Sequence, residues 1–193
     1  MAIQTQASIP HWNYLLAIER DLGEISRYIE FDGRNDSCFS IELAKVLLSA
    51  GAETDVVCKQ LCKILDSNSR ANRIKGYRTE LTKAFPPISN FTVALPRFGM
   101  TLTPWDKWNE PDGVPLWWTG YNKVKHHRHT HYHSASLKNA LNAVAGLFVM
   151  VLYLYKDKAE SAYLTPQPQL LAVDESHYDG EELGASGGIH YKL

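Results

Sequence analysis

Apolar and polar residues follow a helical spacing along the first half of the chain. Between Ser8 and Ile29, apolar residues recur every three or four positions, which predicts a helix with one buried face. The segments 37–65 and 72–85 repeat this spacing, and each is followed by turn-forming residues or prolines. We therefore expect three helices before residue 86.

The segment 134–155 has a different pattern and is predicted to form one long helix. Its second part, from Ala143 to Tyr155, is apolar on every face, as in helices that lie at the centre of a bundle or in a membrane. The apolar run is shorter than the roughly 20 residues of a membrane span, and Asn139 and Asn142 precede it. The pattern indicates the buried central helix of a soluble bundle, with no membrane segment.

The region from about 86 to 116 interrupts the helical pattern. It contains six prolines together with Trp105 and Trp108, and its one strand-like run, 91–95, suggests a small hairpin. A short helix over 116–125 is expected to follow. The predicted fold class is all-α: a four-to-five-helix bundle over 1–165, with a Pro/Trp-rich insertion at about 86–116 before the last core helices. Since aromatic residues are rarely left in solvent, we expect the insertion to pack on the bundle.

Beyond residue 165 the periodicity fades. Residues 166–193 begin with Pro-Gln-Pro, are rich in acidic residues and end in a glycine-rich stretch. We predict that this segment is a flexible acidic C-terminal tail.

Charge and cysteine content exclude some classes of function. The chain has 20 basic and 21 acidic residues, so any attraction to nucleic acid must be local. Its three cysteines have no four-ligand zinc spacing. The N-terminal residues lack a basic region followed by an apolar one, and we therefore expect a cytoplasmic protein.

Five of the eight histidines lie between His126 and His133, interleaved with basic residues. One interpretation is a metal site, since His129, His131 and His133 alternate and would share one face of an extended strand. No glutamate lies close in sequence to complete such a site. A second interpretation is a solvated corner between helices that has no chemistry.

The third interpretation is metal-free cleavage of RNA. Arg128 and His133 form an Arg-x4-His motif directly before the long apolar helix, with the polar His129 after the arginine. This motif, its position, and the preceding string from Trp117 to His126 resemble the HEPN superfamily of helical bundles, many of which are RNases of toxin–antitoxin and phage-defence systems. The resemblance implies a homodimer in which two motifs meet across a cleft, with no metal and no cofactor.

The resemblance also suggests roles for individual residues. His133 would be the acid/base and Arg128 would stabilise charge in the transition state, while Asn122, Lys125, His126 and His129 would position the RNA. We therefore expect a metal-independent endoribonuclease of a toxin or phage-defence type, with an antitoxin or defence-system protein as partner. Two alternatives stay open: a non-catalytic HEPN-like module that binds nucleotide, RNA or a protein partner, and a metal-binding protein.

Overall fold

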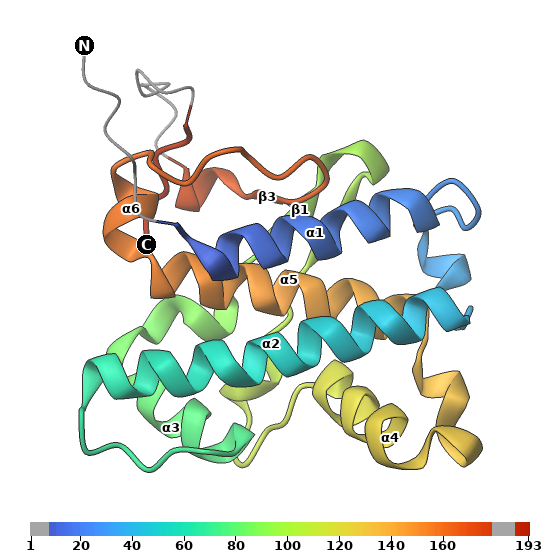
Figure 1. Ribbon diagram of the computed structural model, residues 1–193, viewed down its shortest axis with the longest axis horizontal. Helices are drawn as coiled ribbons and strands as arrows, with labels where there is room; N and C mark the ends of the chain where they lie inside the picture. Colours follow the sequence, from blue (N-terminus) through green and yellow to red (C-terminus); the bar gives the residue numbers. More distant parts are fainter. Residues whose placement is uncertain (1–7, 179–187) are drawn as a thin grey trace.

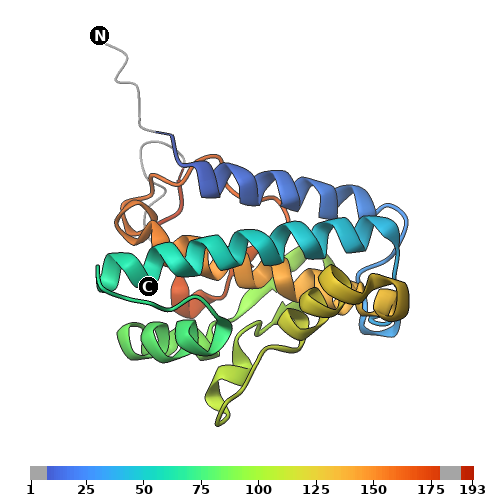
Figure 2. The same cartoon turned by 60° about the horizontal axis from the view of Figure 1, so that its bottom comes forward.

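A computed structural model of the chain describes residues 8–178 and 188–193 and shows a helical bundle (Figure 1). The helices are α1 (Pro10–Ile25), α2 (Ile41–Leu65), α3 (Ile74–Ala84), α4 (Leu116–His131), α5 (Leu137–Leu154) and the short α6 (Lys156–Glu160). Helices α1, α2 and α5 pack side by side, and α3 and α4 lie against α2 on the side away from α1 (Figures 1 and 2). Short 3-10 helices connect them at Gly33–Asn35, Pro86–Asn90, Pro96–Phe98, Asp106–Asn109, Tyr132–Ser134 and Glu175–His177.

Local sequence signals set where the helices begin. Pro10 occupies the first turn of α1. The side chain of Ser40 accepts a hydrogen bond from the backbone N–H of Leu43, and Ser136 does the same for Asn139 at the start of α5. Capping therefore determines the first residues of both α2 and α5.

Helix α5 is the centre of the bundle, as its pattern predicts. It is the one helix among the described residues with the length and apolarity of a membrane span, and 78% of it is buried inside the protein. Residues 134–136, expected to begin this helix, instead form the end of a 3-10 turn and the cap.

The insertion forms the predicted hairpin and packs on α5. Strands β1 (Val93–Leu95) and β2 (Met100–Leu102) pair antiparallel around Gly99, whose φ of 60° suits a residue without a side chain. The indole N–H of Trp105 donates to the carbonyl of Gly146 in α5 at 3.2 Å. The aromatic residues of the insertion therefore belong to the core.

A third strand, β3 (Ala172–Val173), pairs with the free edge of β1 and completes a sheet of order β2-β1-β3. The fold is therefore mainly helical, as predicted, and the expected hairpin is part of one small three-stranded sheet. A strand of two residues has no period that a sequence pattern can reveal.

The prediction of a flexible tail is wrong for residues 166–178 and 188–193. The buried carboxylate of Glu19 in α1 accepts hydrogen bonds from the backbone N–H groups of Gln169, Leu170 and Leu171 at 2.8–2.9 Å. Leu170, Leu171 and Tyr191 are buried, so apolar burial adds to these bonds. The acidic residues at 179, 181 and 182 lie outside the described residues.

Three glycines let α4 approach its neighbours closely. A Cβ on Gly51 of α2 would lie 2.5 Å from the ring of Tyr121, and one on Gly146 of α5 would lie 2.8 Å from the ring of Trp117. A Cβ on Gly120 would lie 2.6 Å from the amide nitrogen of Asn139 in α5. These contacts fix α4 against both α2 and α5, and so position the histidine-rich end of α4.

Candidate functional site

Helix α4 changes character at His127. This residue has φ −139° and ψ 37°, which is not helical, so α4 is kinked between His126 and Arg128. Before the kink, Trp117, Trp118 and Tyr121 are at most 6% exposed. From Lys125 to Thr130 every side chain is exposed. The short helix expected over 116–125 therefore does not end near residue 125 but continues through this kink to His131.

A groove of about 980 Å³ runs between α2 and the kinked end of α4. The apolar and aromatic residues that line it are Ile41, Ala44, Leu48, Val124 and Tyr132. The basic and histidine residues that line it are Lys45, Lys125, His126, Arg128 and His129. The lining includes no aspartate or glutamate. The groove therefore has a local positive charge, although the basic and acidic residues of the whole chain nearly balance.

Three of these five basic and histidine side chains are free to bind a ligand. The side chains of His126, Arg128 and His129 form no hydrogen bond or ion pair with the residues that the structure describes. The ammonium of Lys125 lies 5.3 Å from the ring centroid of Tyr121, and Lys45 pairs with Glu42 at 3.0 Å. Among the described residues, the guanidinium of Arg128 thus keeps all its donors for a further partner.

The other histidines lie outside this lining. The ring centroid of His131 is 6.4 Å from that of His127 and 5.9 Å from that of His133. Partial burial lowers the pKa of His131, and the nearby Lys123 and His133 lower it further. The neutral form of the His131 imidazole is therefore favoured over the protonated form.

The structure does not assemble the metal site that the alternating histidines suggested. Such a site requires an extended strand, whereas residues 128–131 are helical and residues 132–134 form a 3-10 turn. Within residues 8–178 and 188–193, no three His, Cys, Asp or Glu side chains are arranged to hold a metal ion.

Four of the six predicted site residues line the groove: Lys125, His126, Arg128 and His129. His133 does not line it, although Tyr132 of the same 3-10 turn does. Asn122 lines a separate depression with Lys123 and His126, and its amide donates to the carbonyl of Trp118 at 3.0 Å. The structure therefore groups Arg128 with His126 and His129 rather than with His133.

The sequence did not indicate that α2 forms one wall of the groove. Lys45 and Leu48 belong to an ordinary amphipathic pattern, and no motif in α2 indicates that it faces the histidine cluster. Only the packing of α2 against α4 reveals this wall of the groove.

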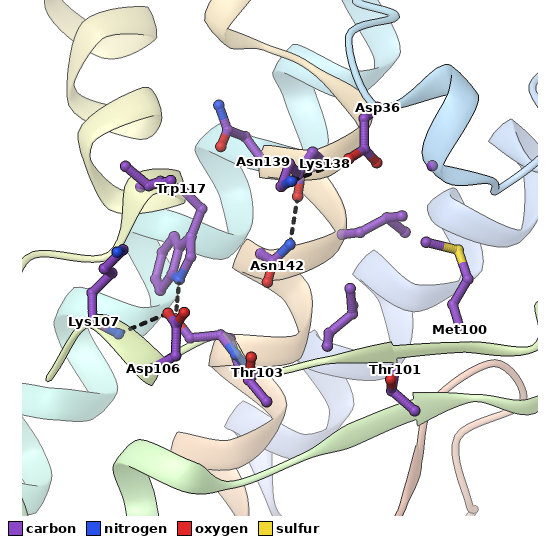
Figure 3. Close-up of a pocket in the computed structure, with 15 residues that line it drawn as sticks. Asp36, Met100, Thr101, Thr103, Asp106, Lys107, Trp117, Lys138, Asn139 and Asn142 are labelled. Carbon is purple, nitrogen blue, oxygen red and sulfur yellow. Dashed lines mark hydrogen bonds and ion pairs between the residues drawn. The ribbon is translucent and has the colours of Figure 1, made fainter. Parts of the chain in front are cut away.

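A second cavity, of about 370 Å³, lies between α5, strand β2 and the start of α4 (Figure 3). It has both charged and apolar walls, and the ammonium of Lys138 pairs with Asp36 beside it at 3.2 Å. No sequence motif pointed to this cavity, because its residues come from four separate segments.

Comparisons of this chain with protein-family models, with curated proteins and with solved structures gave no significant match.

Proposed function

We propose that the protein is a metal-independent endoribonuclease whose active site includes the groove between α2 and α4. The observation that carries this proposal is the lining: five lysine, arginine and histidine side chains and no carboxylate. Such a surface suits a polyanion, and imidazoles within it supply groups that exchange protons near neutral pH.

The chemistry needs three operations. A base removes the proton from the ribose 2′-hydroxyl, the 2′-oxygen bonds to phosphorus, and the bond from phosphorus to the 5′-oxygen breaks as an acid protonates that oxygen. Two imidazoles, one as base and one as acid, suffice for the proton transfers. The guanidinium of Arg128 has the planar fork that binds two phosphate oxygens while charge accumulates on them. The products are a 2′,3′-cyclic phosphate and a 5′-hydroxyl.

The lining favours His126 and His129 as the imidazoles that act beside Arg128 within one chain. The resemblance to HEPN proteins assigns this role to His133 instead, in a homodimer with two facing motifs. Exposed apolar residues beside the groove, Phe39 at 51% and Ile41 at 66%, favour a second copy covering this face. A toxin or phage-defence role and an antitoxin partner rest on the resemblance alone.

The test is RNA cleavage by the full-length protein in excess EDTA, with product ends identified by mass spectrometry. Arg128→Ala should lower the cleavage rate by roughly 10²–10³-fold, because it removes a group that stabilises transition-state charge. Arg27→Ala, an exposed arginine on the segment after α1, is the matched control and should cleave normally. An equal rate for Arg128→Ala and the wild type would reject the proposal.

Comparing His129→Ala with His133→Ala assigns the acid/base. A large loss for His129→Ala alone supports the groove within one chain, and a large loss for His133→Ala alone supports the dimeric motif. Size-exclusion chromatography with light scattering shows whether the active species is a dimer.

The position of His133 outside the groove lining favours one second candidate, a module that binds RNA or nucleotide without cutting it. Retained RNA affinity with no cleavage product under any metal condition would establish this candidate.

A further inference from the structure

The cavity between α5 and β2 presents two asparagine amides on one face of α5 (Figure 3). Asn139 and Asn142 are three positions apart, so they are neighbours on the helix surface. Each amide nitrogen donates to a backbone carbonyl: Asn139 to Ser134 at 2.9 Å, and Asn142 to Lys138 at 2.9 Å.

These bonds fix the orientation of the amides. Since the NH₂ group is held by a carbonyl, Oδ1 cannot exchange places with the nitrogen without losing the bond. Among the described residues no donor bonds either Oδ1. Each asparagine thus keeps one acceptor oxygen and one N–H. Asn142, which is only partly buried, can offer both to a ligand.

The remaining walls suit a flat ring with a polar attachment. Leu102 and Leu141 line the cavity and are buried, and Met100 lies at its side (Figure 3). Lys107 and Lys138 also line the cavity, together with Asp36 and Asp106. The ammonium of Lys107 pairs with Glu110 at 2.6 Å and that of Lys138 pairs with Asp36 at 3.2 Å, so each lysine already has a carboxylate partner. The volume of about 370 Å³ lies within the range of small-molecule sites.

We propose that this cavity binds an adenine ring, with Asn142 as the residue that recognises it. The adenine 6-amino group donates to Oδ1 and adenine N7 accepts from the amide N–H, which is the bidentate pairing that asparagine makes with adenine. Guanine presents two acceptors at the same edge, so one of them would face Oδ1. The ring rests on the leucines, and Lys107 or Lys138 lies near the ribose phosphate. This site is independent of the proposed RNA cleavage.

Two kinds of ligand contain such an adenine ring: a free adenine nucleotide and an unpaired adenosine in a nucleic-acid strand. Isothermal titration of the full-length protein with AMP, GMP and a short oligodeoxyadenylate tests both, since the deoxy strand lacks the 2′-hydroxyl that cleavage needs. AMP should bind more tightly than GMP by roughly five-fold or more. Tighter binding of the oligonucleotide than of AMP identifies the strand as the source, and the reverse order identifies the free nucleotide.

The variant Asn142→Leu keeps a branched side chain of similar size and removes both Oδ1 and the N–H, so it should abolish the preference for AMP over GMP. Asn13→Leu makes the same replacement on the exposed face of α1 and should bind AMP as the wild type does. Thermal melting shows that both variants are folded. The proposal is overturned by absence of AMP binding at millimolar concentration, by equal affinity for GMP, or by an Asn142→Leu variant that retains the preference. None of these outcomes affects the test of RNA cleavage.

Discussion

The two parts of α4, on either side of the kink at His127, differ in nearly every physical respect. The first part buries two tryptophans and a tyrosine against glycines of α2 and α5. The second part exposes Arg128 and His129 on the groove, where they make no hydrogen bond or ion pair with the described residues. The same helix thus provides buried packing residues before the kink and exposed residues of the candidate site after it. Substitutions of the buried aromatic residues in the first part should lower stability, whereas substitutions of the exposed residues on the groove should change mainly binding and catalysis.

The largest effect on stability is expected at Trp117. Trp117→Ala removes a buried indole that packs on Gly146 and donates to the carbonyl of Pro104 at 2.8 Å, and should lower the free energy of unfolding by about 3–5 kcal/mol. Arg128→Ala should change it by no more than about 0.5 kcal/mol, since its side chain is exposed and unpaired within the described protein. Urea denaturation followed by far-UV circular dichroism measures both values. Similar losses for the two variants would refute the division of α4.

A smaller effect is expected on RNA binding, and it distinguishes two lysines of the same helix. Lys125 lines the groove, whereas Lys123 lines the separate depression beside Asn122. Lys125→Gln should therefore weaken binding of an uncleavable oligonucleotide and lower the slope of log K against log salt by about 0.7, as expected for one lost phosphate contact with a single strand.

Lys123→Gln is the control, with the same change of charge two residues away. It should leave the salt slope unchanged. Fluorescence anisotropy at several salt concentrations gives both slopes, and equal slopes for the two variants would show that RNA does not distinguish the groove from its surroundings.

The smallest effect concerns pH and His131. Its pKa in the folded protein is lowered below the ordinary value of about 6.5, so the unfolded chain binds more protons in this range. The contribution of His131 to stability should therefore be retained above pH 6.5 and should be lost as the pH falls toward the folded-state pKa.

His131→Gln should accordingly show a shallower loss of thermal stability between about pH 7 and 5 than the wild type does. His11→Gln is not a suitable control, because His11 pairs with Glu53 at 2.6 Å. His126→Gln, exposed on the other side of the kink, is the better comparison. A steeper profile for His131→Gln would contradict the assigned direction.

The fold could be predicted where the burial of one face of an element gives the apolar residues a regular spacing along the sequence. The all-round apolar pattern of 143–155 identified the core helix, and the strand-like run at 91–95 identified the hairpin. The amphipathic helices were also predicted, and α2 continues without a break through Gly51. That glycine has a packing role instead, since Tyr121 occupies the space of its missing side chain.

The remaining features depend on contacts that no local pattern contains. Glu19 lies on the apolar face of α1, four residues after Leu15 and three before Leu22, where its charge would ordinarily oppose burial. It is 4% exposed because backbone groups some 150 residues later bond to it. In the candidate site, the sequence could not determine whether residues 126–133 form strand, helix or turn. The kink at His127 and the 3-10 turn after it decide that His129, not His133, lies beside Arg128 in the groove.

The hydrogen bonds of Glu19 have a consequence for synthesis of the chain. The first helix leaves the ribosome early, but the N–H groups that bond its carboxylate belong to Gln169, Leu170 and Leu171, which are made much later. Until then this carboxylate has no native partner and must remain hydrated, because burying it unpaired would cost several kcal/mol. Docking of α1 in its final position is therefore expected to wait until nearly the whole chain has been translated.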